Sequence, residues 1–282
     1  EEWLSSFPKN ILLYQAFGWQ APKFIHLTLT LNKEGGKLSK RQGDVAVEDY
    51  KYKGYLPEAL LNFCVLQGWH PSASAKAPKE KTDEILSLDE MIAYFDYKDM
   101  GTSPAIFNIE KLDYFNGYYI RQMSLEKLTK LCLPFMRENL KLTKNTRKQS
   151  AEFMQKVIWL EQERLKKLSE IGELTDFFFN DELNYEVKLL IWKNLSEQQI
   201  KENLQVVYDI LEKIEDSDWL KENLEREIIN YLKTRELKVG DYLWPARVAL
   251  TGRRASPGPF EVAEVLGKKE SLRRINQAVK KL

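Results

Sequence analysis

Glycine, histidine and cysteine are scarce in this chain of 282 residues, which contains 13 Gly, two His and two Cys. Few glycines and many charged residues favour helices, because Gly opposes helix formation while Lys and Glu support it. Cys64 and Cys132 form no CxxC pair, so neither a disulfide framework nor a structural zinc site is predicted. Both are expected to be reduced core residues of a cytoplasmic protein.

Long apolar runs are also missing. No run reaches the ~18 residues that a membrane span needs, so no membrane association is predicted. The N-terminus reads Glu1-Glu2-Trp3 and lacks both the basic and the apolar region of a signal peptide. It also lacks an initiator Met, which is typical of a fragment or a processed chain.

The two signs of charge nearly balance, with 43 Lys and Arg against 42 Asp and Glu, but they are unevenly placed. Residues 238–282 carry ten basic and four acidic side chains, a net +6, and the first 237 residues carry about −5. A basic end on an otherwise acidic chain favours a polyanionic partner. From charge alone, a solvated basic helix terminus explains the pattern equally well.

The periodicity of apolar residues predicts a small α/β beginning and a helical remainder. Residues 8–17 read as a short helix, and residues 24–31 alternate as in a strand with one buried face. After residue 45 the pattern is helical, with capping boxes that begin at Ser87 and Ser196. Pro134 is predicted to kink or stop the helix that precedes it.

A basic loop at residues 35–41 follows the predicted strand and reads Gly-Gly-Lys-Leu-Ser-Lys-Arg. Two glycines allow a tight turn and a close backbone approach to a ligand. Ammonium groups and free backbone N–H groups both stabilise a phosphoryl anion, so the composition is typical of a nucleotide-phosphate loop. An ordinary basic turn has the same composition.

The string Lys37-Leu38-Ser39-Lys40-Arg41 resembles the KMSKS signature of class I aminoacyl-tRNA synthetases. With its flanks, the chain resembles bacterial-type glutamyl-tRNA synthetases from Glu1 to Leu282. The flanking segments that carry this resemblance are residues 1–6, 14–19, 22–27, 54–63, 68–69, 116–121, 249–252 and 256–258.

The resemblance implies a mainly α chain in three parts. Residues 1–50 are expected to be a short α/β remnant of a class I Rossmann catalytic domain that ends in the KMSKS-like loop. Residues 51–125 are expected to form a mixed, largely helical stem-contact region, and residues 126–282 an all-helical anticodon-binding domain. The implied partners are tRNA-Glu, glutamate and ATP with Mg²⁺, and a monomer is expected.

In the family, the second lysine of the loop stabilises the ATP phosphates, which gives Lys40 the catalytic role here. Lys37, Leu38, Ser39 and Arg41 are the other expected ATP-loop members. The family's second signature, a HIGH-type motif, needs two His separated by two residues, but His26 and His70 lie 44 residues apart. The chain as given is therefore expected not to aminoacylate tRNA.

The resemblance also carries anticodon contacts onto Arg247, Ser256 and Pro257. Arg164 is a further candidate, for the anticodon base that separates glutamate from glutamine tRNA. A solvated charge beside two glutamates, Glu161 and Glu163, is the alternative explanation for Arg164.

Asn116, Tyr118, Tyr119 and Arg121 are expected to face the tRNA inner corner, or else to form a tyrosine-rich packing seam. Three functional alternatives stay open. They are a non-discriminating synthetase that also charges glutamine tRNA, a glutaminyl-tRNA synthetase, and a free-standing tRNA-binding module. The helical second half argues against the glutaminyl family, which reads anticodons with β-barrels.

Overall fold

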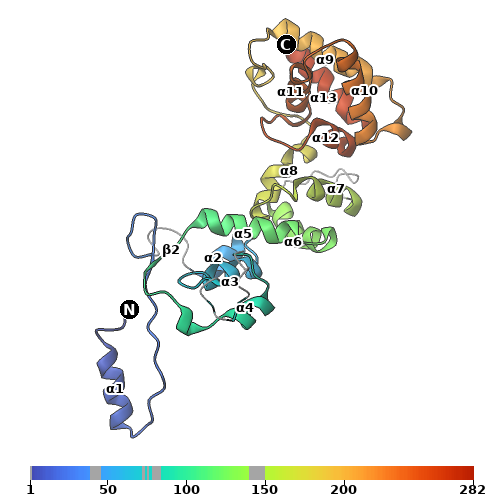
Figure 1. The fold of residues 1–282 in the computed structure, drawn as a ribbon. Coiled ribbons are helices and arrows are strands. Elements are labelled where there is room, and N and C mark those ends of the chain that lie inside the picture. Colours follow the sequence, from blue (N-terminus) through green and yellow to red (C-terminus); the bar gives the residue numbers. More distant parts are fainter. Residues whose placement is uncertain (1, 39–45, 72–73, 75, 78–83, 140–149) are drawn as a thin grey trace. The chain divides into compact units, whose positions relative to one another are not determined.

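The computed structural model describes residues 2–38, 46–71, 74, 76–77, 84–139 and 150–282. Backbone contacts divide the chain into two compact units, residues 1–122 and 123–282, which are described separately (Figure 1). Ser39, Lys40 and Arg41 of the basic loop lie outside the described residues. None of the helices that are described is long and apolar enough to span a membrane.

The first unit is built from helices and one small sheet. α3 and α5 pack against each other and bury Ala59, Phe63, Leu112 and Phe115 between them. A second apolar cluster is formed by Trp69 with Leu86 and Met91. The helices of this unit are α1 (Phe7–Ala16), α2 (Val47–Tyr52), α3 (Pro57–Val65), α4 (Leu88–Tyr94), α5 (Ile109–Arg121) and a 3₁₀ turn at Tyr97–Asp99.

The sheet consists of β1 (Thr30–Leu31) and β2 (Ala105–Ile106), which pair in parallel. The prediction of a strand over residues 24–31 is therefore wrong for its first six residues. Ile25 and Leu27, assigned to a buried face, are both 56% exposed. Alternation supplies the side-chain pattern of a strand, but a strand also needs a neighbour for its backbone groups. Among the described residues, β2 provides that neighbour only at the end of the segment.

The second unit is entirely helical in its described residues. α6, α7 and α8 pack together, α9 packs against α11 and α13, and α12 contacts α7, α10, α11 and α13. The helices are α6 (Leu125–Asn139), α7 (Ala151–Glu161), α8 (Ile171–Phe179), α9 (Glu197–Glu212), α10 (Lys221–Thr234), α11 (Val239–Thr251), α12 (Pro259–Leu266) and α13 (Lys268–Lys281). Three 3₁₀ turns lie at Leu168–Glu170, Val187–Leu189 and Asp216–Asp218.

The predicted helix N-caps form in the structure. Ser87 and Ser196 each accept a hydrogen bond from the backbone N–H three residues later, which completes both predicted capping boxes. Pro134 lies inside α6 and does not end the helix, so of the two predicted outcomes the stop is wrong. The mainly α fold class, with a small α/β beginning and an all-helical second half, is confirmed.

Arg274 of α13 connects three segments of the second unit and is only 1% exposed. Its guanidinium donates to the carbonyl oxygens of Leu250 at 2.6 Å, Phe177 at 2.9 Å and Asn180 at 3.1 Å. Nε donates to the Glu270 carboxylate at 2.7 Å, which compensates the buried charge. These bonds fix the C-terminal ends of α8 and α11, and those ends are adjacent to the candidate site.

Candidate nucleic-acid interface

The glycine turn before the basic loop is held by its own backbone. Gly36 N–H donates to the side-chain oxygen of Asn32 at 2.8 Å, and Asn32 N–H donates to the Gly36 carbonyl at 2.8 Å. Gly35 has φ +83°, a left-handed conformation that side chains disfavour. Leu38 N–H then donates to Thr30 at 3.2 Å, so the start of the loop runs beside β1.

Lys37 and Leu38 are the described members of the KMSKS-like string. The Lys37 ammonium forms an ion pair with Glu2, and both side chains are more than half exposed. This hydrogen bond and the charge of Lys37 hold the pKa of Glu2 below its ordinary value. A cavity of about 410 Å³ adjoins the pair and is lined by Glu2, Trp3, residues 25–30, Lys37 and Leu38. The roles of Lys40, Ser39 and Arg41 remain predictions.

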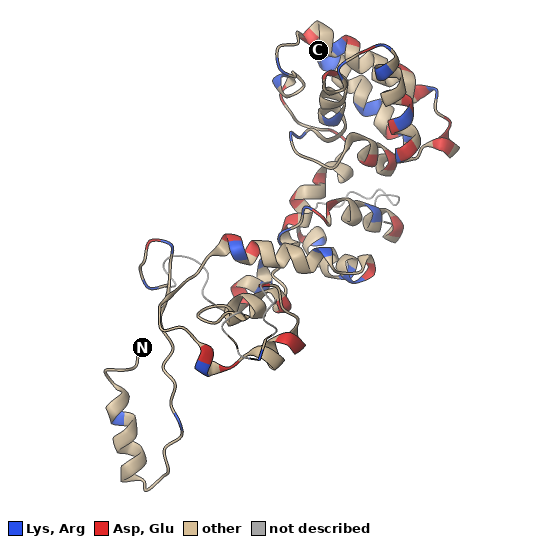
Figure 2. Ribbon diagram, in the orientation of Figure 1, with Lys and Arg blue, Asp and Glu red and all other residues tan. Residues whose placement is uncertain are grey.

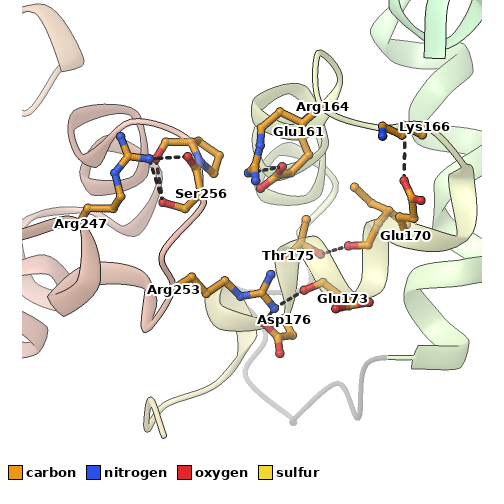
Figure 3. A network of polar contacts seen from close by, with 12 residues as sticks. Glu161, Arg164, Lys166, Glu170, Glu173, Thr175, Asp176, Arg247, Arg253 and Ser256 are labelled. Carbon is orange, nitrogen blue, oxygen red and sulfur yellow. Dashed lines mark hydrogen bonds and ion pairs between the residues drawn. The ribbon is translucent and has the colours of Figure 1, made fainter. Parts of the chain in front are cut away.

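In the second unit, Arg247, Ser256 and Pro257 meet at one point. Arg247 lies on α11, and its Nη1 donates to the Ser256 carbonyl at 2.6 Å and the Pro257 carbonyl at 3.2 Å (Figure 3). Nη1 also lies 3.5 Å from the Ser256 hydroxyl, which itself donates to Pro257 at 2.9 Å. The structure thus brings Arg247 onto the adjacent pair Ser256 and Pro257, which lie nine and ten positions later in the chain.

The turn between these residues depends on a left-handed glycine. Gly252 ends α11 with φ +69°, and its N–H donates to Val248 at 2.7 Å. A Cβ there would lie 3.2 Å from the ring of Tyr185, so both the conformation and the space favour glycine. The next residue, Arg253, donates to Asp176 at 2.6 Å and to the Glu173 carbonyl, which ties the turn to α8.

Arg164 lies just beyond the end of α7 and faces this turn (Figure 3). Its Nη1 donates to the Glu161 carboxylate at 2.8 Å, and its side chain is 33% exposed. Glu161 is completely buried, so Arg164 pairs with a buried carboxylate and not with a solvated one. Burial raises the pKa of Glu161 to about 7, against the opposing charges of Arg164 and Arg253.

Arg164 and Arg247 are electrostatically coupled. Burial lowers the pKa of Arg247, and the positive charge of Arg164 lowers it further. Guanidinium forks from two separate segments therefore lie in one partly exposed site, with several N–H donors available. Such forks recognise base edges and phosphate oxygens, and unstacked RNA bases are commonly bound by them.

The middle segment behaves differently from this site. Asn116 is fully buried, and its side chain accepts from Leu56 N–H at 2.8 Å. The Tyr119 hydroxyl donates to the Leu86 carbonyl at 2.7 Å, and burial raises the pKa of Tyr119 to about 12. Both residues hold the first unit together, which favours the packing seam over an RNA contact at these two positions.

Several basic residues of the C-terminal stretch bond within the protein. Arg274 is buried, Arg273 pairs with Glu270 at 2.7 Å, and Lys281 donates to the Leu183 carbonyl at 3.1 Å. Basic and acidic residues are also intermingled over the second unit (Figure 2). The net +6 of this stretch is therefore not a simple exposed patch, and the Arg247 site is a better-defined candidate for contact with a polyanion.

Two residues of the site, Asp176 and Arg253, were not predicted from the sequence, and Glu161 was predicted only as a charge beside Arg164. Glu161 precedes Arg164 by three residues, a spacing that places two side chains on one helix face. That signal suggests the pair but not its burial. Nothing in the spacing of Arg253 and Asp176, 77 positions apart, indicates that they meet.

Two family models match this chain. Residues 127–279 match the anticodon binding domain, and residues 1–114 match the class I (E and Q) tRNA synthetase catalytic domain. The first match spans more than half of the chain. The chain therefore belongs to the anticodon-binding-domain family, with part of a class I synthetase catalytic domain before it.

Relatives narrow the comparison. Glutamate–tRNA ligases of Clostridium botulinum (strain Okra / Type B1) and Clostridium tetani are 39% and 40% identical over the whole chain. The resemblance to glutamyl-tRNA synthetases is thereby confirmed. The chain spans 55% and 54% of those two proteins, about half of their length.

Solved structures agree with the relatives. A glutamate tRNA ligase from Elizabethkingia meningosepticum, crystallised in complex with its amino acid, matches with a TM-score of 0.78 and 30% identity. The glutamate-tRNA synthetase of Elizabethkingia anophelis matches with a TM-score of 0.75 and 32% identity. Each match covers 99% of this chain, and 56% and 55% of the respective solved chains.

Proposed function

We propose that this chain forms the tRNA-binding and anticodon-reading portion of a glutamate–tRNA ligase. The proposal rests on one observation: Arg247 donates hydrogen bonds to Ser256 and Pro257. The positive charge of Arg164 lowers the pKa of Arg247 at the same site. The whole enzyme would join glutamate to tRNA-Glu with ATP in the cytoplasm, as a monomer. The division at residues 50 and 125 into catalytic, stem-contact and anticodon-binding parts belongs to the same proposal.

Anticodon recognition needs donors that are fixed in place and still reachable. Arg247 is half-buried and is anchored through one nitrogen, so its remaining N–H groups can meet a splayed-out base. The Ser256 hydroxyl and the backbone around Pro257 add polar groups at the same point. Arg164 lies on a different segment from Arg247 and is held there by Glu161, which leaves its outer N–H groups for a second base.

Titration of tRNA-Glu with the full chain tests this binding. We expect the logarithm of the association constant to fall linearly with that of salt concentration, because each phosphate contact releases condensed counterions. Arg247→Ala should weaken binding by about 1–3 kcal/mol, the usual range for an arginine that reads a base. Lys280→Ala, which removes an exposed charge from the same basic stretch, should have a much smaller effect.

Two outcomes would contradict the proposal. Equal losses in the Arg247 and Lys280 variants would mean that the stretch acts only as diffuse positive charge. An absence of tRNA binding would remove the function altogether. Arg247→Lys separates charge from geometry, because lysine keeps the charge but cannot reproduce the guanidinium fork.

The basic loop has a separate proposed role in the whole enzyme. Lys40 would stabilise the ATP phosphates as pyrophosphate leaves, with Lys37, Leu38, Ser39 and Arg41 as loop members. Mg²⁺ would accompany the nucleotide. The left-handed turn at Gly35 suits a loop whose backbone approaches phosphate closely.

These 282 residues alone are proposed not to activate glutamate. His26 and His70 do not have the spacing of a HIGH-type motif, so one of the two class I signatures is missing from the chain. Glutamate-dependent exchange of pyrophosphate into ATP measures activation directly. A robust exchange signal from this chain would show that the proposal is wrong.

The alternatives differ in tRNA choice and in catalysis. A non-discriminating synthetase would bind glutamate and glutamine tRNA about equally, whereas a discriminating one prefers the first. A free-standing binding module would show tRNA affinity with no catalytic partner. Parallel titrations with both tRNAs decide the first question, and an upstream HIGH-type motif in the reading frame would exclude the module.

A further inference from the structure

Glu161 is a buried acid whose position is not explained by packing alone. It is the last residue of α7, its side chain has no exposed surface, and Oε2 accepts from Arg164 Nη1 at 2.8 Å. Its other oxygen, Oε1, is buried with no hydrogen-bond partner among the residues that the structure describes. A half-satisfied buried carboxylate is costly, and an apolar residue in its place is often neutral or stabilising.

The turn around Glu161 fixes the backbone of Arg164 as well as its side chain. The Glu161 carbonyl accepts from both Arg164 N–H and Leu165 N–H at 2.9 Å. Leu165 is fully buried, and Gln162 anchors the same turn by donating to the Met123 carbonyl at 2.9 Å. The backbone of Arg164 is therefore already fixed, and the Glu161 carboxylate selects one orientation of its guanidinium group.

The charged groups that face Glu161 come from two elements. Arg164 follows α7 itself, and Arg253 follows α11 and is engaged with Asp176 of α8. The positive charge of Arg164 also lowers the pKa of Arg247. The negative charge of an ionised, buried Glu161 thus offsets the repulsion between these arginines.

We propose that Glu161 is a positioning residue that holds the Arg164 guanidinium ready to read the anticodon base at which glutamate and glutamine tRNAs differ. This inference rests on the proposed tRNA-binding function. The ionised carboxylate binds Nη1 of Arg164 and leaves the other guanidinium N–H groups for a ligand. Without that charge the side chain samples more orientations, and preference between two base edges falls more than total affinity does.

The decisive measurement compares two RNAs that differ at one base. Wild-type protein and Glu161→Gln are titrated with a tRNA-Glu transcript and with the same transcript carrying the third anticodon base of glutamine tRNA. Glu161→Gln keeps the shape of the side chain but removes its charge. The ratio of the dissociation constant for the altered transcript to that for the tRNA-Glu transcript is expected to fall about tenfold. Glu163→Gln, an exposed glutamate two positions away, should leave the ratio unchanged.

A double-mutant comparison shows whether Glu161 acts through Arg164. In an Arg164→Ala background, Glu161→Gln should have no further effect on the ratio, because the group that it positions is gone. An independent effect in that background would overturn the positioning role. So would a Glu161→Gln ratio equal to that of wild type.

The pH dependence of the wild-type ratio supports the same test without a variant at position 161. The pKa of Glu161, raised by burial to about 7, lies within the range in which tRNA binding can be measured. Discrimination should therefore decrease as pH falls through about 7, and Arg164→Ala should abolish this dependence. Equal discrimination by wild type and Arg164→Ala would overturn the inference even if Glu161→Gln failed to fold.

Failure of the inference can be separated from failure of the proposed function. A wild-type protein that binds no tRNA overturns both. A wild-type protein that binds tRNA with salt dependence and discriminates, but does so equally well with Gln at position 161, overturns only the positioning role.

Discussion

The N-terminal segment at residues 2–31 and the second unit bury their apolar side chains to very different degrees. α1 has no buried residue, and Leu12, Phe17 and Trp19 are each more than 60% exposed. The second unit instead encloses a continuous set of fully buried side chains, among them Leu204, Ile275 and Phe178. α1 is also almost free of charged residues, whereas α9 to α13 carry many (Figure 2).

The contrast shows what helix formation and stability each require. α1 is ten residues long and is contacted mainly by aromatic neighbours, such as the edge-on pair of Phe7 and Phe24 at 4.7 Å. An isolated helix of that length is marginal in water, because packing rather than propensity stabilises most protein helices. The second unit has that packing within itself. Equivalent substitutions should therefore have large effects there and small ones in residues 2–31.

The largest effect is expected at Arg274. Arg274→Ala leaves the Glu270 carboxylate without one of its partners, together with three carbonyl groups at the ends of α8 and α11. Breaking a buried ion pair in this way costs about 3–5 kcal/mol. Urea unfolding followed by circular dichroism measures it, with the exposed Lys280→Ala as control. A loss below about 1 kcal/mol would mean that these bonds contribute little.

A matched pair of leucines tests the comparison directly. Leu204 on α9 is fully buried and Leu12 on α1 is 63% exposed. Leu204→Ala should lower the free energy of unfolding by about 2–5 kcal/mol through lost transfer energy and a cavity. Leu12→Ala should change it by less than about 0.5 kcal/mol, as exposed substitutions usually do. Similar losses at both positions would show that residues 2–31 share a cooperative core.

Features of the fold and the site that depend on neighbours in the sequence were predicted, and features that depend on distant segments were not. Capping by Ser87 and Ser196 depends on neighbours three residues away, so the sequence was sufficient for both. The strand at residues 24–31 failed because pairing depends on β2, about 75 positions later. The burial of Glu161 was not predicted, because it is set by helices packed around α7, which no local pattern reports.

The site shows the same limit. Arg247, Ser256 and Pro257 were expected to act together because of the resemblance, and they do meet, although their contact with RNA stays a prediction. The network that holds them in place was not foreseeable. It links Arg253 to Asp176 and Arg274 to Phe177 across 77 and 97 positions, through carbonyl and carboxylate groups that any sequence of helices would contain.

The stability of the second unit should depend on the protonation of Glu161. Its pKa of about 7 in the folded protein exceeds the ordinary value of 4.5, so the folded state binds this proton more tightly. The associated stability is complete below about pH 4.5 and is lost as pH rises through 7, by up to about 3 kcal/mol. Unfolding of wild type and Glu161→Gln across this range should show the difference, with Glu163→Gln behaving as wild type. Parallel profiles for all three would contradict it.

The smallest expected effect separates two glycines with the same backbone conformation. Gly252 has φ +69° and Gly18 has φ +67°, so alanine introduces similar strain at both, about 1 kcal/mol. At Gly252 the new methyl group also lies 3.2 Å from the Tyr185 ring, whereas nothing lies within 4 Å at Gly18. Gly252→Ala should therefore lower the free energy of unfolding by roughly 1–2 kcal/mol. Gly18→Ala should leave the main unfolding transition unchanged, because strain within residues 2–31 changes the free energy of that transition only if the segment unfolds together with the core. An equal shift for both variants would show that the weakly buried segment is coupled to the rest of the protein.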